Sequence, residues 1–315
     1  MCYGVDMAVS CPSCGSNKLI ELEKYETFTL HGCLSCDLQT WHPFKNPGSH
    51  FYEEHTNYIW RNHNPEEWNL YPAPRRFLSK KRRGETLLDI GMGVGKFLSA
   101  ADLTGYRVTG FDFNKDSVQV AKDHYGLGDV HVATLDEFMK EDRKFDVITM
   151  FELIEHLDDF DTLLKIRDHL NESGLLVLST PWRGRWTPFM RGDTPPHHLS
   201  RFSDESIKNV LETRGFKVTE IWHSPIVFSR YMMRFSEWTK GYLSFGIAEK
   251  LTKNDSPRVP GAQRKKTIKQ KIIRALSLVK LYGLFMFPAL ILYVYLSLTG
   301  GRNRTGMYVE ARRQT

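Results

Sequence analysis

The residues best suited to chemistry follow an apolar run at residues 145–151. Glu152, Glu155 and His156 are spaced by three and four, so a helical turn would place all three side chains on one face. Two carboxylates and an imidazole can hold a divalent cation, and the imidazole alone can accept a proton. The residues equally allow a plainer interpretation, in which Glu152 and His156 only shape a pocket and pair within it.

A second functional segment begins at Asp89, which ends the apolar run 87–90. Alternate glycines follow it and precede a helix-forming stretch: Gly91, Gly93 and Gly95. Such a turn leaves the backbone bare, so that a ligand can approach the helix N-terminus. Asp112 ends the next apolar run, where a carboxylate can accept hydrogen bonds from a ribose.

The details of this glycine turn disfavour a nicotinamide cofactor. Lys96 occupies the place of the third glycine in the dinucleotide pattern G-x-G-x-x-G. Asp89 also puts a charge where that pattern is usually apolar.

The pattern D-x-G-x-G-x-G over residues 89–95, with Asp112 after the next strand, resembles the class I S-adenosylmethionine-dependent methyltransferases. The resemblance implies that Asp89 and the glycine loop hold the methionine end of S-adenosylmethionine and that Asp112 holds the ribose. We also place three apolar residues at the cofactor site: Phe113, Leu135 and Phe151.

Residues 145–156 are similar to the corresponding motif of the ubiquinone-biosynthesis O-methyltransferases and the small-RNA 2′-O-methyltransferases. In those families the two acids and the histidine can hold Mg²⁺, with a further histidine in the RNA enzymes. His198 is the candidate for that histidine, which implies a site of Glu152, Glu155, His156 and His198. Alternatively, His156 or His198 removes the proton of an acceptor hydroxyl, with Glu152 in the same pocket.

Four cysteines near the N-terminus form two C-x2-C pairs, Cys11 with Cys14 and Cys33 with Cys36, separated by eighteen residues. This spacing is typical of a zinc ribbon, in which four thiolates bind one tetrahedral ion. Structural disulfides are the alternative, and a cytosolic chain disfavours them. The zinc would be structural, because no open coordination position is implied.

The order of the elements predicts an α/β fold with a doubly wound, seven-stranded sheet. Strands and helices alternate from residue 85 to residue 223, and the last strand would be residues 306–313. The expected organisation is a zinc ribbon (1–40), an aromatic connector or lid (41–84), the methyltransferase core (85–223), an insertion (224–305) and the final strand with the tail (306–315).

Charge and hydropathy set the insertion apart. The chain has 315 residues and a net charge of +6, yet residues 262–315 hold eleven Lys or Arg and one Glu. Seven of these cations lie in 263–280, interleaved with aliphatic residues, and an uncharged segment follows at 281–298. This arrangement favours an anchor lying in, or re-entering, the inner face of a membrane. A buried cap on the soluble domain is the alternative.

Together these features predict a methyltransferase in the cytoplasm, associated peripherally or monotopically with the membrane. The first residues lack the pattern of a signal peptide. We expect O-methylation of a sugar, a lipid-linked glycan or an isoprenoid-type acceptor, since the layout resembles methyltransferases of bacterial surface-polysaccharide synthesis. The rivals are an RNA 2′-O-methyltransferase, which the position of the basic charge disfavours, and a non-catalytic adaptor that keeps the fold. The sequence leaves the oligomeric state open.

Overall fold

The computed structural model describes residues 9–48, 50–52, 72–80, 85–184, 193–226, 228, 231–232, 286–299 and 304–314. The chain divides into two units. The first comprises Met1–Arg183, Phe189–Ser224 and Gly306–Thr315, and the second comprises Gly184–Pro188 and Pro225–Thr305.

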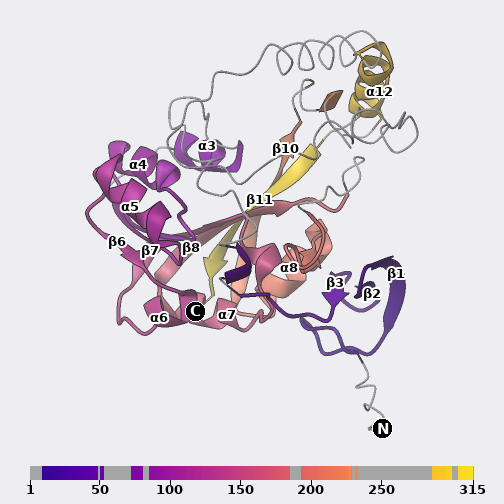
Figure 1. Ribbon diagram of the computed structural model, residues 1–315, viewed down its shortest axis with the longest axis horizontal. Helices are drawn as coiled ribbons and strands as arrows, with labels where there is room; N and C mark the ends of the chain where they lie inside the picture. Colours follow the sequence, from indigo (N-terminus) through magenta and orange to yellow (C-terminus); the bar gives the residue numbers. More distant parts are fainter. Residues whose placement is uncertain are drawn as a thin grey trace, which may run out of the picture. The chain divides into compact units, whose positions relative to one another are not determined.

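The first unit is built on a seven-stranded sheet with the spatial order β10-β11-β8-β7-β4-β5-β6 (Figure 1). Strands β4 to β8 pair in parallel, whereas β11 runs antiparallel to β8. The strands are β4 (Thr86–Ile90), β5 (Arg107–Asp112), β6 (Val130–Val132), β7 (Phe145–Phe151), β8 (Leu170–Pro181), β10 (Phe216–Pro225) and β11 (Arg304–Arg313). The predicted α/β fold is confirmed, and the segment predicted as the last strand is β11.

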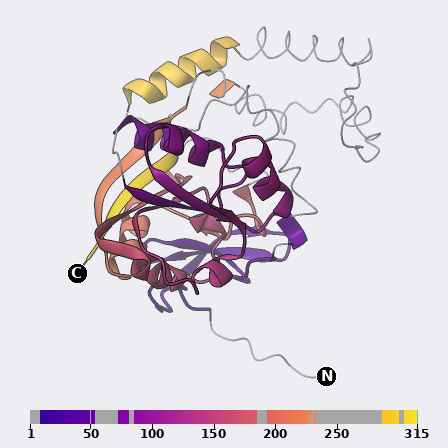
Figure 2. The ribbon, with the colours of Figure 1, turned by 90° about the vertical axis from the view of Figure 1, so that its left-hand side faces the viewer.

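Helices cover both faces of this sheet, because successive residues of its central strands are apolar. Leu87 and Val147 belong to a buried cluster with α3, α4 and α5, and Leu88 and Ile148 belong to another with α6, α7 and α8. Figure 2 views the sheet from the side of α4 and α5. The helices are α3 (Pro72–Ser79), α4 (Lys96–Leu103), α5 (Lys115–Asp123), α6 (Leu135–Phe138), α7 (Thr162–Asp168) and α8 (Asp204–Glu212).

The cysteine-bearing segment forms a second sheet with the order β1-β2-β3-β9. Its strands are β1 (Leu19–Tyr25), β2 (Phe28–Cys33), β3 (Gln39–His42) and β9 (Ser200–Arg201). The first three are consecutive in the chain, but β9 comes from residues 85–223, the predicted core. The boundary expected at residue 40 therefore falls inside a strand that pairs with that core.

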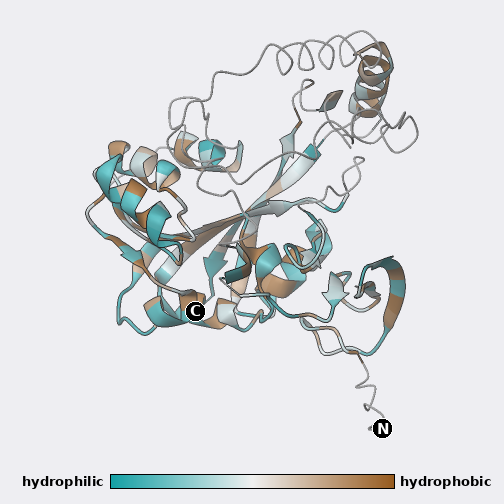
Figure 3. Ribbon diagram, viewed as in Figure 1, coloured by the Kyte–Doolittle hydropathy of each residue, from teal (hydrophilic) through white to brown (hydrophobic). Residues whose placement is uncertain are grey.

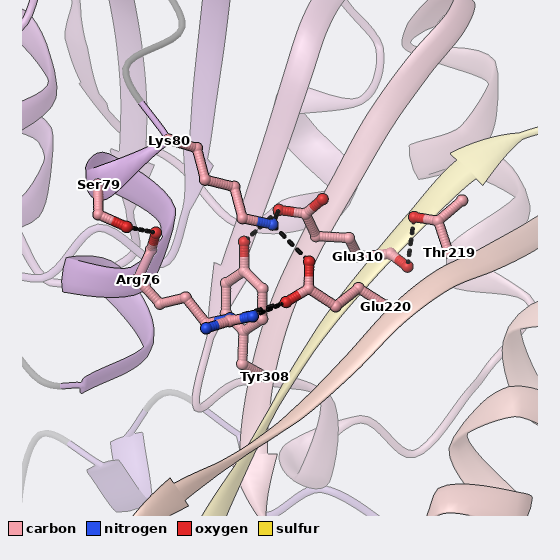
Figure 4. A network of polar contacts seen from close by, with 7 residues as sticks. All are labelled: Arg76, Ser79, Lys80, Thr219, Glu220, Tyr308 and Glu310. Atoms are coloured by element: carbon pink, nitrogen blue, oxygen red, sulfur yellow. Dashed lines mark hydrogen bonds and ion pairs between the residues drawn. The ribbon is translucent and has the colours of Figure 1, made fainter.

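A network of polar contacts connects α3 to β10 and β11, at the edge of the seven-stranded sheet (Figure 4). Lys80, just after α3, places its Nζ 2.5 Å from Glu220 Oε2 on β10 and 2.6 Å from Glu310 Oε1 on β11. Arg76 also donates to Glu220, and the Tyr308 hydroxyl donates to Glu310. Glu310 is almost fully buried, so its charge requires a partner of this kind. The network thus ties the segment before β4 to the two last strands.

In the second unit, α12 (Met286–Leu298) has two apolar faces. Ala289 and Leu296 pack against Ile226, Tyr231 and Met232, and Tyr293 Oη donates to the carbonyl of Ile226 at 3.2 Å. The opposite face is exposed and consists of Phe287, Leu290, Ile291, Val294, Tyr295 and Leu298. Figure 3 shows α12 as a mainly hydrophobic helix.

Among the described residues, none of the helices combines the length and the apolar character needed to cross a bilayer. The basic segment 263–280 and residues 281–285 lie outside the described residues.

Candidate active site

The glycine loop between β4 and α4 has the left-handed backbone that its sequence predicts. Gly91, Gly93 and Gly95 have φ values of +69°, +56° and +79°. A Cβ at Gly95 would lie 2.8 Å from Leu127 Cδ1 and 2.9 Å from the Cβ of Ala121. Both the backbone conformation and the close approach of α5 therefore require glycine at this position.

Asp112, at the end of β5, holds this loop in place. Its Oδ2 accepts the N–H of Gly93 and its Oδ1 accepts the N–H of Asn114, each at 2.9 Å. The side chain is only 5% exposed, and burial raises its pKa above the ordinary value. Each carboxylate oxygen has two lone pairs, so the group can still accept hydrogen bonds from a ribose. The expected role for Asp112 fits this geometry and stays a prediction.

Asp89 is buried inside the sheet. Its Oδ1 accepts a hydrogen bond of 2.6 Å from Thr149 Oγ1 on β7. Burial raises the pKa of Asp89 to about 7, and the charge of the nearby Asp112 adds to the effect. A neighbouring positive charge would favour the ionised form of Asp89. A sulfonium cofactor carries such a charge, so the two acids at the ends of β4 and β5 fit S-adenosylmethionine.

The other predicted cofactor residues differ in exposure. Phe113 is 37% exposed and its ring centroid lies 6.2 Å from that of Tyr52. Phe151 is half-buried, with its ring 4.8 Å from that of Phe97. Leu135 begins α6, which Thr134 caps. Their contact with a cofactor stays a prediction.

The structure brings Glu155, His156 and His198 together across more than forty residues of sequence. One potential metal-ligating atom from each lies within 4.8 Å of the others. Glu155 is fully buried, and neither of its carboxylate oxygens has a hydrogen-bond partner among the described residues. Burial and the nearby Glu152 carboxylate raise the pKa of Glu155 well above its ordinary value. His198 Nε2 lies 3.9 Å from Glu155 Oε1, too far for a hydrogen bond, and a bound cation would relieve the cost of burying this carboxylate.

Glu152 does not join this cluster, contrary to the prediction of one shared helical face. The short 3₁₀-helix η1 spans Ile154–His156 and begins too late to include it. Glu152 instead has a left-handed backbone, with φ of +52°. Its Oε1 accepts a hydrogen bond of 2.7 Å from Ser179 Oγ on β8. In this part of the described structure, the residues that could hold a cation together are therefore Glu155, His156 and His198.

The hydrogen bonds of His156 fix which ring nitrogen carries the proton. Its Nδ1 lies 2.6 Å from the carbonyl oxygen of His197, which can only accept, so Nδ1 is the donor. The second nitrogen, Nε2, then keeps a lone pair for a metal or a proton. Burial lowers the pKa of His156 to about 4, which keeps the ring neutral at pH 7. Both a metal ligand and a proton acceptor require this neutral form.

Asn46 and Tyr52 also belong to this site, although no motif in the sequence marks them. Asn46 Nδ2 donates to the carbonyl of His156 at 2.8 Å, and the Tyr52 hydroxyl lies 3.2 Å from His156 Nδ1. The Tyr52 ring thus touches both Phe113 and His156. Burial raises the pKa of Tyr52 to about 12, so it stays a neutral phenol. The aromatic richness of residues 41–74 signals a covering segment but singles out neither residue.

The four cysteines gather at one point, and their geometry fits zinc. The Sγ atoms of Cys11 and Cys36 lie 3.5 Å apart, and those of Cys14 and Cys33 lie 3.6 Å apart. Zn–S bonds of about 2.3 Å place tetrahedral sulfur atoms about 3.8 Å from one another. All four offer ligand atoms within 4.8 Å of each other. The donor set is therefore that of a closed structural site.

The doubly wound sheet, its left-handed glycine loop and the acid after β5 define a class I methyltransferase fold. Residues 60–221, more than half of the chain, match the family described as the methyltransferase domain, and the chain belongs to that family.

Several known proteins are similar to this chain over part of their length. A probable S-adenosylmethionine-dependent methyltransferase of Mycolicibacterium smegmatis is 29% identical over 45% of this chain and 56% of its own. A ubiquinone biosynthesis O-methyltransferase of Pelagibacter ubique is 34% identical over 33% of this chain and 45% of its own. The chain spans about half the length of these curated relatives.

A solved structure of Haemonchus contortus phosphoethanolamine N-methyltransferase 2 shares the fold. Its TM-score is 0.50, at 16% identity, covering 84% of this chain and 59% of that protein.

Proposed function

We propose that this protein transfers a methyl group from S-adenosylmethionine to an oxygen atom of an acceptor. One observation carries the proposal: Tyr52 contacts Phe113, beside the cofactor loop, and His156, in the Glu155 cluster. Tyr52 therefore connects the predicted cofactor loop with the cluster. Relatives named as ubiquinone biosynthesis O-methyltransferases support oxygen as the methylated atom.

For methyl transfer, the main task of the protein is to position the acceptor against the methyl group. Bound S-adenosylmethionine supplies an electrophilic methyl group, and the acceptor must lie in line behind it. The acceptor hydroxyl must also lose its proton. His156 is neutral and oriented by its Nδ1–H bond, so that Nε2 can accept this proton, an effect worth about 10²–10⁴-fold.

A divalent cation such as Mg²⁺ is the alternative way to acidify the hydroxyl. Glu155, His156 and His198 would hold it, and it would lower the pKa of a coordinated hydroxyl. The Glu155 carboxylate favours this version, because it is buried and its oxygens accept no hydrogen bond among the described residues.

Chelation and mutation separate the two versions. If a cation is needed, EDTA followed by gel filtration abolishes methyl transfer, and Mg²⁺ restores it without changing S-adenosylmethionine affinity. If His156 is a metal-free base, chelation has no effect and His156→Ala loses rate. His124→Ala, at the exposed histidine that caps the C-terminus of α5, is the matched control. Full activity in both chelated wild type and His156→Ala would refute both roles.

We further propose that the acceptor is a hydroxyl on a lipid-linked sugar or isoprenoid-type molecule, met at the inner face of a membrane. The exposed stripe on α12 supports this, because six large apolar side chains face away from the residues that α12 packs on. Seven Lys or Arg in 263–280 add attraction to anionic lipid. Mass spectrometry of lipids and glycans from cells with and without the gene product should reveal the methylated species.

RNA is the rival acceptor, supported by the cysteine cluster. Binding of RNA that falls steeply with salt, and that survives removal of residues 226–303, would favour it over a lipid-linked acceptor. A non-catalytic adaptor would instead bind S-adenosylmethionine and transfer methyl to neither class.

A further inference from the structure

The cysteine cluster and the Glu155 cluster are joined through one residue, Leu199. Its carbonyl accepts the N–H of Trp41 on β3, at 2.9 Å, and its own N–H donates to the carbonyl of Glu155, at 2.8 Å. Leu199 is fully buried. His198 directly precedes it, so the backbone that presents His198 is held between the cysteine-bearing sheet and the η1 turn.

The pairing continues into β9 and is reinforced by side chains. Thr40 lies opposite Ser200, and Gln39 lies opposite Arg201. The Arg201 guanidinium stacks over the Trp41 ring at 5.0 Å and pairs with Glu23 on β1 at 2.8 Å. Because Arg201 and Trp41 are almost fully buried, the cation–π contact between them is shielded from water and salt.

A second connection starts in the turn between β2 and β3, here called the β2–β3 knuckle, which carries Cys36. Asp37, next to Cys36, accepts hydrogen bonds from Arg183 Nη2 and from Ser203 Oγ, each at 2.5 Å. Arg183 in turn donates its N–H to the carbonyl of Phe202, at 2.8 Å. Asp37 therefore connects the cysteine-bearing segment to Arg183 and to Ser203, which lies just after β9.

The turn that carries the histidines is closed by two backbone hydrogen bonds, from the N–H groups of His197 and His198 to the carbonyl of Thr194, at 3.1 and 3.3 Å. Between residues 193 and 199 the described backbone has no regular helix or strand beyond one short 3₁₀ position at Asp193. The Sγ–Sγ distances of the four cysteines fit a single zinc ion, which would lock the β2–β3 knuckle through Cys33 and Cys36.

We propose that the zinc ribbon, defined as residues 11–42, is a positioning element of the acceptor site and not a separate recruitment module. With zinc bound, β3 and Asp37 hold the segment 193–202 so that His198 faces Glu155 and the carbonyl of His197 orients His156. Without zinc the knuckle loosens, the β3–β9 pairing weakens, and these side chains lose their geometry. This inference rests on the proposed methyl transfer for its catalytic consequence only.

The test uses full-length protein and three readouts: hydrogen exchange, S-adenosylmethionine binding by calorimetry, and transfer of tritiated methyl from S-adenosylmethionine to a membrane extract. Cys33→Ser removes a zinc ligand. Asp37→Ala breaks the tie to Arg183 and Ser203 but leaves the four cysteines intact, so it serves if Cys33→Ser fails to fold. In both variants we expect exchange at residues 193–202 to rise about tenfold.

Methyl transfer should fall about a hundredfold in both variants, since misplacement by an ångström costs that much. S-adenosylmethionine affinity and exchange in β4 and β5 should stay at wild-type values, which a general loss of folding would not allow. Glu26→Ala is the matched control for Asp37→Ala, because both residues are exposed and left-handed, with φ of +52° and +60°. Cys2→Ser is the control for Cys33→Ser.

Wild-type exchange at residues 193–202 and wild-type methyl transfer in folded, zinc-free protein would overturn the proposal. If the wild-type protein transfers no methyl to any extract, the proposed function fails, and hydrogen exchange still decides whether the ribbon positions this segment.

Discussion

Asp89, which ends β4, provides a test of the predicted cofactor site that requires no substrate. Its carboxylate is buried in the sheet, and its pKa rises from the ordinary 3.8 to about 7. An acid whose pKa is raised by folding destabilises the native state wherever it is ionised. Wild-type protein should therefore lose stability as pH rises from about 4 to 7, and lose no more from this group above that range.

The magnitude follows from the same values. Each pH unit between the unfolded and folded pKa is worth about 1.4 kcal/mol, so Asp89 costs at most about 4 kcal/mol at pH 8. Asparagine has the same shape, still accepts the Thr149 hydrogen bond, and carries no charge. Relative to its difference from wild type at pH 4.5, Asp89→Asn should gain about 3 kcal/mol by pH 8, because about 1 kcal/mol is already lost by wild type at pH 4.5.

Urea unfolding of both proteins, without cofactor, at several pH values between 4.5 and 8.5 measures this gain directly. Asp142→Asn, at an exposed acid, is the control and should show no such trend. Equal stability differences at pH 5 and pH 8 would refute the argument that Asp89 is desolvated. Saturating S-adenosylmethionine should narrow the gap at pH 8, because its sulfonium favours the ionised carboxylate.

Three further predictions concern the glycine loop, the ribose acid and α12. Gly95→Ala should lower the free energy of unfolding by about 1–3 kcal/mol through strain and overlap, whereas Gly128→Ala, whose Cβ meets no atom within 4 Å, should be nearly neutral by thermal unfolding. Asp112→Ala should weaken S-adenosylmethionine binding by about 1.5–3 kcal/mol in calorimetry, and unchanged affinity would remove the acid from the cofactor site. Leu298→Glu, on the exposed stripe of α12, should reduce flotation with anionic vesicles, while Leu103→Glu, at an equally exposed leucine of α4, should not. Equal flotation of the two variants would argue that the stripe does not meet lipid.

Local pattern was enough to predict the core of the fold. The buried run before Asp89, the alternate glycines after it and Asp112 twenty-odd residues later each depend on neighbours in sequence. Parallel strands connected by helices also meet in a predictable way, because their carboxyl ends share one edge of the sheet. The same logic predicted β11 as the last strand, although the residues between it and β10 are numerous.

Predictions about side chains near that edge were less secure. Spacing alone placed Glu152 with Glu155 and His156, on the assumption of a helical turn from residue 152. The backbone instead turns left-handed at Glu152 before η1 begins. The carboxylate of Glu152 therefore accepts a hydrogen bond from Ser179 on β8. A left-handed backbone at a single residue redirects its side chain, and the spacing of residues in the sequence does not predict where this occurs.

The sequence by itself predicted the strands of the large sheet, the glycine turn after the first of them, and the four cysteines that converge, because each depends on short-range periodicity or fixed spacing. Only the tertiary structure decided that β3 of the ribbon pairs with β9, and that Asn46 and Tyr52 reach His156. These contacts join residues more than a hundred positions apart. Their register follows from how β9 and the ribbon pack on the core, and no local pattern in either segment encodes its partner.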